Sequence, residues 1–158
     1  MNKEIAIETL LDLLRRGNSA EISASGYSMF PTLRPGDRVL VSPIKENESP
    51  VPGDILIIKA DNSLVLHRLI EIRMNNEANT VFITRGDCMN ESDPPVMSDQ
   101  IVGIAHSFRR NNKQRLLSSL VPAKSGYKFN KMKLWVWFKM KKLKGLRRSV
   151  CRLRYQGI

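Results

Sequence analysis

The sequence has no long hydrophobic run and very few cysteines. No stretch reaches the 18 apolar residues that a membrane-spanning helix needs. The first 17 residues are interrupted by acids and are followed by no small-residue cleavage site, so they lack the pattern of a secretory signal. Cys88 and Cys151 are the only two cysteines, and neither lies in a CxxC pair. These features exclude a disulfide-stapled scaffold and indicate a reducing compartment, or indifference to redox.

Acidic residues are missing from the last third of the chain. Residues 1–108 hold 10 basic and 15 acidic residues, a net charge of −5, whereas residues 109–158 hold 16 basic residues and no acid. The net charge of +11 therefore hides a weakly acidic body and a strongly basic tail. We predict an N-terminal amphipathic helix within residues 1–20, a β domain over 21–108 and a basic amphipathic helical tail over 109–158.

The body of the chain has the pattern of short strands separated by turns. Residues 3–16 carry apolar side chains at helical spacing, and Gly17-Asn18 is a stop signal. From Glu21 onward no helical pattern interleaves the strands, which predicts a mainly β fold built as a compact barrel or sandwich. The expected strands are 38–41, 54–59, 64–73, 80–84 and 101–108, with a long polar loop over 86–99.

The tail repeats apolar residues at steps of three or four. Lys and Arg fill most positions between them, and Trp135, Trp137 and Phe138 cluster near its start. This pattern predicts a cationic amphipathic helix, weakened in the middle by Gly145. The apolar residues in question are Met132, Val136, Met140, Leu143, Leu146, Val150 and Leu153.

Ser28 lies in an unusually stiff segment, which reads SASGYSMFPTLRPGD from Ser23 to Asp37. A hydroxyl becomes a nucleophile only when a base takes its proton and nearby amides hold the oxyanion. Gly26 allows close approach of a substrate backbone, and Pro31 stiffens the loop. The alternative is an ordinary turn serine.

His67 lies in the strand pattern SLVLHRLIEI. Alternation places Val65, His67 and Leu69 on one face and Leu66, Arg68 and Ile70 on the other. A histidine there is either a satisfied core residue or a general base, for which its ordinary pKa near 6.5 is suited.

Asp87 and Asp93 lie in the segment TRGDCMNESDPP. Beside Gly and Pro, such aspartates are either turn formers or carboxylates that orient an imidazole. A metal site made from Cys88, His67, His106 and these aspartates is a weaker hypothesis, because their spacings match no zinc or EF-hand template.

Taken together and in this order, these segments resemble the signal peptidase I family and its relatives, the LexA-type self-cleaving repressors. The His67-Arg68 pair is similar to the Ser-His-Asp type found in archaea and the endoplasmic reticulum, where bacterial enzymes have Lys-Arg. The resemblance covers roughly residues 21–106. It depends on Gly26-x-Ser28-Met29-x-Pro31-Thr32-Leu33-x-x-Gly36-Asp37, Pro52-Gly53-Asp54-Ile55, His67-Arg68, and Thr84-x-Gly86-Asp87 followed by Asp93.

The resemblance implies a serine endopeptidase with a LexA- or signal-peptidase-like catalytic β domain. Ser28 is the implied nucleophile, His67 its base, Asp93 the residue that orients the base, and Asp87 a supporting acid. The Ser28 amide is the implied oxyanion donor, and no metal or cofactor is required. Lysine-type enzymes carry a serine two positions before the nucleophile, where this chain has Gly26. Family enzymes acting on exported proteins usually begin with a membrane-spanning segment, which this sequence does not show.

The expected partner is a peptide or preprotein substrate. The aromatic and basic residues of the tail also predict contact with an anionic membrane surface, hence a peripheral membrane location or otherwise a cytoplasmic one. The alternative for the tail is docking on its own domain. Two further functions stay open. One is a self-cleaving LexA-like regulator, although the roughly 20 residues before the first strand are too few for a helix-turn-helix domain. The other is a catalytically idle protein that binds lipid or nucleic acid, with nucleic acid the less expected ligand.

Overall fold

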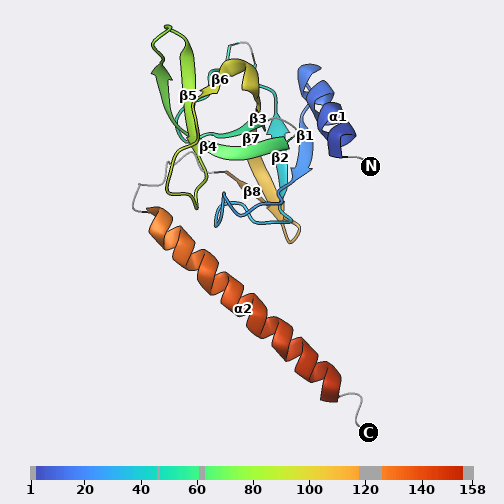
Figure 1. Ribbon diagram of the computed structural model, residues 1–158. Coiled ribbons are helices and arrows are strands. Elements are labelled where there is room, and N and C mark those ends of the chain that lie inside the picture. The colour runs from blue at the N-terminus through green and yellow to red at the C-terminus, as the bar shows by residue number, and fades with distance from the viewer. Residues whose placement is uncertain (1–2, 46, 61–62, 118–125, 155–158) are drawn as a thin grey trace.

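The structure is a computed structural model that describes residues 3–45, 47–60, 63–117 and 126–154. Figure 1 shows a β domain with a short helix beside it and a long helix below it. The prediction of a mainly β fold with an N-terminal and a C-terminal helix is confirmed. The elements are α1 (Lys3–Arg15), β1 (Ala20–Ser23), β2 (Arg38–Ser42), β3 (Ile55–Ala60), β4 (Ser63–Met74), β5 (Thr80–Arg85), β6 (Val96–Met97), the 3-10 helix η1 (Ser98–Gln100), β7 (Ile101–Arg110), β8 (Lys113–Leu116) and α2 (Gly126–Arg154).

The strands form one antiparallel sheet in the order β1-β2-β7-β3-β4-β5-β6, with β8 added to β7. The long strand β4 pairs along its first half with β3 and along its second half with β5. Register shifts interrupt the β2–β7, β3–β7 and β4–β5 ladders. Such bulges bend and twist strands, which lets one sheet curl around its own core.

The alternation predicted for β4 is confirmed by two apolar clusters on opposite faces of the sheet. Leu64 and Leu66 pack against the larger cluster, which includes Val39, Val41 and Ile57. Leu69 belongs to a second cluster, which also contains Leu56, Ile58, Phe82 and Val96. His67 pairs with Leu56 and therefore lies on the same face as Leu69.

Helix α1 packs on the β domain by its apolar side. Leu10 and Leu14 are buried in the larger cluster, while Ile5 and Leu13 remain exposed. The helix ends at Arg15, because Gly17 adopts a left-handed φ of +80° and its amide closes on Leu14 O. The predicted amphipathic helix and its stop signal are therefore confirmed.

The last third of the chain differs from the prediction in two respects. Residues 109–116 are not helical, because β7 extends to Arg110 and pairs with β8 through a turn at Asn111 and Asn112, both with positive φ. Helix α2 begins only at Gly126 and continues unbroken past Gly145, so this glycine does not end the helix. Residues 118–125 of the expected tail lie outside the described residues.

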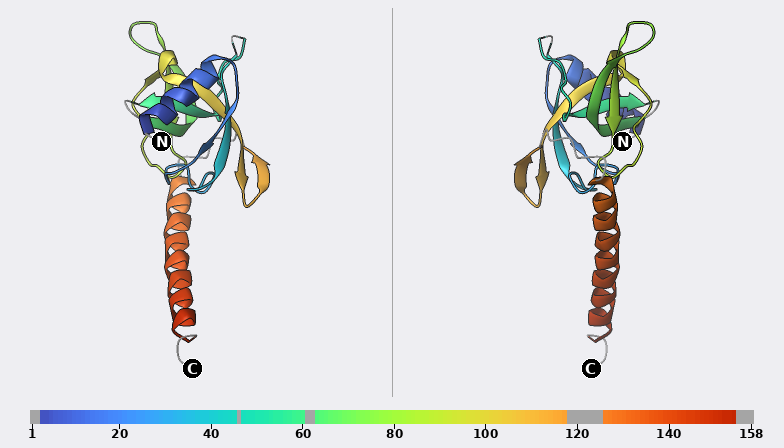
Figure 2. Two further views of the ribbon diagram at one scale, coloured as in Figure 1. Left: turned by 90° about the vertical axis from the view of Figure 1, so that its right-hand side faces the viewer. Right: turned by 90° about the vertical axis from the view of Figure 1, so that its left-hand side faces the viewer.

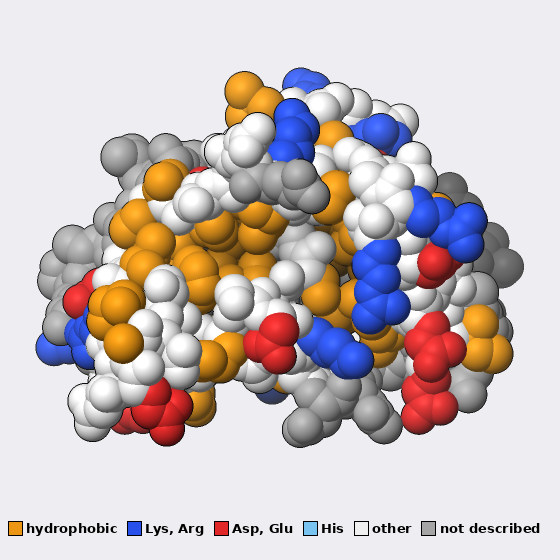
Figure 3. Space-filling model, turned by 90° about the horizontal axis from the view of Figure 1, so that it is seen from above, with side chains coloured by type: hydrophobic (Ala, Val, Ile, Leu, Met, Phe, Trp, Pro, Cys, Tyr) orange, Lys and Arg blue, Asp and Glu red, His pale blue; other side chains and the backbone are white. Residues whose placement is uncertain are grey.

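Helix α2 extends away from the β domain as a single rod (Figure 2). Within the described ranges, no helix combines the length and the apolar character needed to cross a bilayer. At the end of the domain away from α2, hydrophobic side chains gather in a hollow (Figure 3). The end of the β domain opposite α2 therefore has an apolar surface.

Candidate active site

The loop that carries Ser28 closes on itself and on the start of β2. Ala24 N donates to Asp37 O at 2.9 Å, and Gly36 N donates to Ala24 O at 2.8 Å. Gly36 has a φ of +90°, which only glycine adopts without strain. The peptide bond between Phe30 and Pro31 is cis. The two ends of residues 24–37 are therefore tied together, and the segment between them forms a compact loop.

A partly buried ion pair fixes one end of this loop to the sheet. Arg110, on β7, donates through Nε to Asp37 Oδ1 at 2.8 Å and through Nη2 to Asp37 Oδ2. The same Nη2 donates to Thr32 O at 3.0 Å, and Arg34 N donates to Asp37 Oδ2 at 2.8 Å. Because bidentate Arg–carboxylate pairs are directional as well as strong, they set the position of the loop.

A second ion pair lies beneath the loop and is almost completely buried. Arg68 donates through Nε and Nη2 to the two carboxylate oxygens of Asp87 at 2.8 and 2.9 Å, and through Nη1 to Gly53 O at 2.7 Å. Thr32 Oγ1 donates to the same carboxylate. The Pro52-Gly53-Asp54, His67-Arg68 and Gly86-Asp87 segments meet here, so Asp87 links the loop to β4 and contacts no imidazole.

Asp93 is the aspartate that contacts the imidazole of His67. His67 Nδ1 donates to Asp93 Oδ2 at 2.6 Å, and Thr84 Oγ1 donates to the same oxygen at 2.7 Å. Asp93 N donates to Thr84 O at 2.8 Å, which holds the loop against β5. His67 itself is buried. This bond fixes the ring with Nε2 directed away from Asp93, the orientation that a general base requires.

The surroundings of Asp93 favour its ionised form. Burial by itself would raise the pKa of Asp93, but the hydrogen bonds from His67 and Thr84 and the charge of His67 together lower it below its ordinary value of 3.8. The carboxylate is therefore negative at neutral pH and stabilises a positive charge on His67.

Ser28 lies against the segment that follows β5. The β4–β5 register pairs Arg68 with Arg85, the residue directly before Gly86. A Cβ added to Gly86 would lie 3.0 Å from Ser28 Cβ and 2.7 Å from Ser28 O. Gly86 has no side chain, and this allows Ser28 to lie directly against the backbone that leads to Asp87.

The Ser28 hydroxyl has no hydrogen-bond partner among the residues that the structure describes. The expected contact of His67 with Asp93 is present, whereas a hydrogen bond between Ser28 and His67 is absent. Catalytic hydrogen bonds are often long before substrate binds. The backbone oxygen of Ser28 accepts a hydrogen bond from Cys88 N at 2.8 Å. This bond ties the loop of residues 24–37 to the Gly86-Asp87 turn.

Cys88 is the nearest alternative nucleophile, but its environment favours the neutral thiol. Burial raises the pKa of Cys88, Lys131 opposes this effect, and Asp87 adds to it. Because the thiolate is the reactive form, a raised pKa makes this cysteine a weak nucleophile at neutral pH.

Ser28 lies between two cavities. One is an apolar groove of about 690 Å³, which runs from the loop to α1 and β1. The other has a volume of about 430 Å³ and is lined on one side by α2. The groove is lined by Ala6, Ile7, Leu10, Glu21, Ile22, Ser23, Ala24, Ser25, Gly26, Ser28, Met29, Leu33, Leu64, Val65 and Leu66. The second cavity is lined by Tyr27, Ser28, Cys88, Met89, Asn90, Glu91, Lys131 and Leu134. An extended chain passing over the hydroxyl would thus meet a different surface on each side.

Helix α2 contacts the loop on both sides of Ser28. Trp137 packs against Tyr27 and Phe30, with ring centroids 5.7 and 5.9 Å apart, and Phe138 packs against Tyr27 at 5.0 Å. Asn130 Nδ2 donates to the backbone oxygen of Asp87 at 2.7 Å. Such aromatic contacts are favourable beyond the area they bury. The helix therefore docks on its own domain beside Ser28, which is the alternative that the sequence analysis left open for the tail.

The other metal-ligating candidates do not join this group. His106 is exposed on β7, and its backbone oxygen accepts from Leu117 N. Over the described ranges, no three side chains of His, Cys, Asp or Glu are arranged to hold a metal ion. Sequence reasoning missed the roles of Thr32 and Thr84, although both lie inside the motifs that it singled out.

Comparison with models of known protein families found no match to this chain. A search of curated proteins found no significant match either.

Proposed function

We propose that the chain is a serine endopeptidase of the signal peptidase type, which cleaves leader or signal peptides through an acyl-enzyme. The observation that carries this proposal is the hydrogen bond between the buried His67 and Asp93, together with the packing of Ser28 against Gly86, in the segment that leads to Asp93. The sequence motifs that resemble the family supply the same three residues in the same roles. The apolar groove beside Ser28 suits an extended hydrophobic segment, and by the resemblance the cleavage follows small residues.

The mechanism follows from the groups at hand. Ser28 Oγ attacks the scissile carbonyl carbon while Nε2 of His67 accepts the hydroxyl proton, and Asp93 stabilises the resulting imidazolium. The Ser28 amide donates to the oxyanion. When the C–N bond breaks, His67 returns the proton to the leaving nitrogen and Ser28 retains the acyl group as an ester. A water molecule, deprotonated by His67, then hydrolyses the ester and restores Ser28.

We expect Ser28→Ala and His67→Ala each to reduce cleavage of a peptide panel by at least about 10³-fold, because each removes a group that acts as part of one unit. Labelling by a fluorophosphonate should also disappear in Ser28→Ala. The matched control is Ser49→Ala, which removes an exposed hydroxyl that lines neither of the two cavities beside Ser28 and should leave both readouts unchanged.

Wild-type turnover in either Ser28→Ala or His67→Ala would end the proposal. The intact mass of protein incubated alone separates the two peptidase hypotheses. A shorter product that forms only when Ser28 is present would show self-cleavage of the LexA type instead of action on a separate peptide.

A further inference from the structure

Helix α2 uses one side to contact the β domain. Three residues of α2 are half-buried against the domain. Asn130 donates a hydrogen bond to it, Leu134 lines the second cavity, and Trp137 packs against Phe30. Their spacing of four and three residues places them along one stripe of the helix. If the amphipathic helix served only to dock on its own domain, its other sides would be polar.

The opposite side of α2 is apolar and exposed. Phe129, Met132, Val136 and Met140 retain 63%, 54%, 43% and 51% of their accessible surface. At about 100° per residue they lie roughly 160° to 240° around the axis from Leu134. The helix therefore has a second apolar stripe, which we call the outer stripe, directed away from the β domain.

Lysines border the outer stripe on both sides, and no acid lies near it. Lys128 and Lys139 lie along one border and Lys133 along the other, by the same angular count. Trp135 lies beside the first border, is 57% exposed, and has Lys139 Nζ 4.0 Å from its ring centroid. The whole of α2 carries seven lysines, four arginines and no acidic residue.

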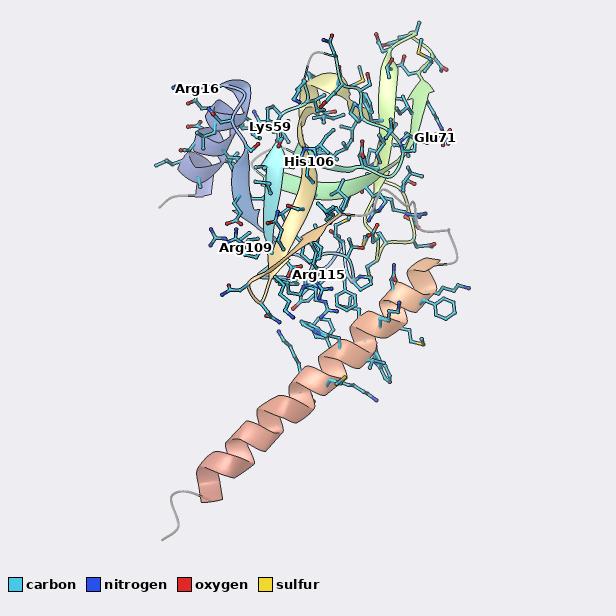
Figure 4. All side chains as sticks on the ribbon, turned by 180° about the vertical axis from the view of Figure 1, so that it is seen from behind. Arg16, Lys59, Glu71, His106, Arg109 and Arg115 are labelled. Atoms are coloured by element: carbon cyan, nitrogen blue, oxygen red, sulfur yellow. The ribbon has the colours of Figure 1, made fainter. Side chains whose placement is uncertain are left out.

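The β domain adds positive charge at the same end of the molecule. In Figure 4, Arg109 and Arg115 lie at the end of the domain that faces α2, whereas Arg16 and Lys59 lie at the opposite end. Both Arg109 and Arg115 are exposed. The domain therefore adds positive charge at the end from which α2 extends, and the outer stripe has a lysine border of its own.

We propose that the outer stripe binds the surface of an anionic lipid bilayer, with α2 lying in the plane of the interface. Helices that lie in a membrane interface typically have an apolar stripe with an aromatic residue and a lysine border. The apolar side chains are buried among acyl chains, and the lysines are attracted to anionic headgroups. Nucleic acid fits less well. Its phosphates would pair with the lysines alone and would leave Met132, Val136 and Met140 exposed to water. This binding does not depend on the peptidase activity, and it makes the protein peripheral to the membrane.

The full-length protein should float with vesicles made of equal parts phosphatidylcholine and phosphatidylglycerol. The triple variant Phe129→Ser/Val136→Ser/Met140→Ser keeps every charge and should bind at least about tenfold more weakly, because it loses most of the apolar burial. The matched control Phe129→Leu/Val136→Leu/Met140→Leu should bind as wild type. Binding to poly(U) at the same salt should be equal for all three proteins.

Two tryptophans give a second readout that does not alter the stripe. Trp137→Phe leaves only Trp135 beside the stripe, and its emission should be strongly quenched by brominated phosphatidylglycerol vesicles. Trp135→Phe leaves only the domain-facing Trp137, which should be quenched less. Equal quenching, wild-type flotation of the serine variant, or a stripe-dependent dimer that never binds vesicles would each overturn the proposal.

Discussion

Asp87 and Asp93 lie six positions apart and have different partners. Asp87 accepts two hydrogen bonds from Arg68, whereas Asp93 accepts one from His67 and one from Thr84. The difference arises because adjacent residues of β4 point to opposite faces, so that His67 and Arg68 cannot share a carboxylate. In our proposal Asp93 acts on the base and Asp87 acts on the loop.

We expect Asp93→Asn to lower kcat/KM on a peptide substrate by about 10²- to 10⁴-fold, because a neutral amide neither fixes the tautomer of His67 nor stabilises its charge. Asp87→Asn should instead act mainly through stability, with KM and kcat of the folded fraction changed less. The two variants are compared by steady-state kinetics on protein whose folded fraction has been measured. Equal kinetic losses in the two variants would contradict the division of roles.

The lowered pKa of Asp93 also predicts how stability depends on pH. Its ionised form is stabilised in the folded state, so the contribution is complete above the ordinary pKa of 3.8 and is lost as the pH falls through the lower, folded-state pKa. The gap in urea midpoint between wild type and Asp93→Asn should therefore be largest near neutral pH and shrink below about pH 4. A gap that is constant down to pH 3 would contradict this origin.

Among the secondary-structure elements, local patterns predicted most of the fold. The alternation in β4 and the glycine stop after α1 gave those elements to within one or two residues, because period and turn chemistry are local signals. Strands β6 and β8 were missed. Val96–Met97 buries Val96 but is too short to show a period, and Lys113–Leu116 is exposed along its whole length, so neither strand shows an alternation that a sequence pattern could reveal.

The candidate site also has a part that local motifs predict and a part that they do not. Ser28, His67 and both aspartates were predicted from their motifs, but the partner of each aspartate depends on the strand face and on long-range register. The contact of Trp137 with Phe30 was not predictable from the sequence pattern, because ring packing between residues so far apart in the chain has no local signature. Nor did the sequence show that α2 would be apolar on two opposite sides.

The ion pair between Arg68 and Asp87 joins β4 to two loops and should be among the most costly to break. We expect Arg68→Met to reduce the free energy of unfolding by about 3–5 kcal/mol, because it leaves a buried carboxylate without its cation. The matched control is Arg73→Met on the same strand, whose pair with Glu71 is exposed and should contribute about 1 kcal/mol or less. Urea denaturation measures both, and equal losses would contradict the role assigned to Asp87.

In the whole molecule, α2 lies between the loop that carries Ser28 and the lipid surface that we propose. Its inner side packs against Tyr27 and Phe30, which are close to Ser28 in the chain, and its outer stripe faces away from the β domain. A helix with its side chains is about 10–12 Å thick. Since an extended chain covers about 3.3 Å per residue, a substrate leaving the bilayer needs about four residues to pass α2 before it meets the cavity that α2 and Ser28 both line.

This arrangement predicts a preference for substrates that are held at the membrane. A peptide tethered to phosphatidylglycerol vesicles by a linker of a few residues should be cleaved faster by wild type than by Phe129→Ser/Val136→Ser/Met140→Ser, because only wild type concentrates Ser28 at the surface. The same peptide free in solution should be cleaved equally by both proteins, since the outer stripe does not contact Ser28. If the serine variant cleaved the tethered peptide as fast as wild type, α2 would have no part in presenting the site. If it were slower on both peptides, the substitutions would have disturbed the loop through Tyr27 and Phe30, and the membrane would not be the cause.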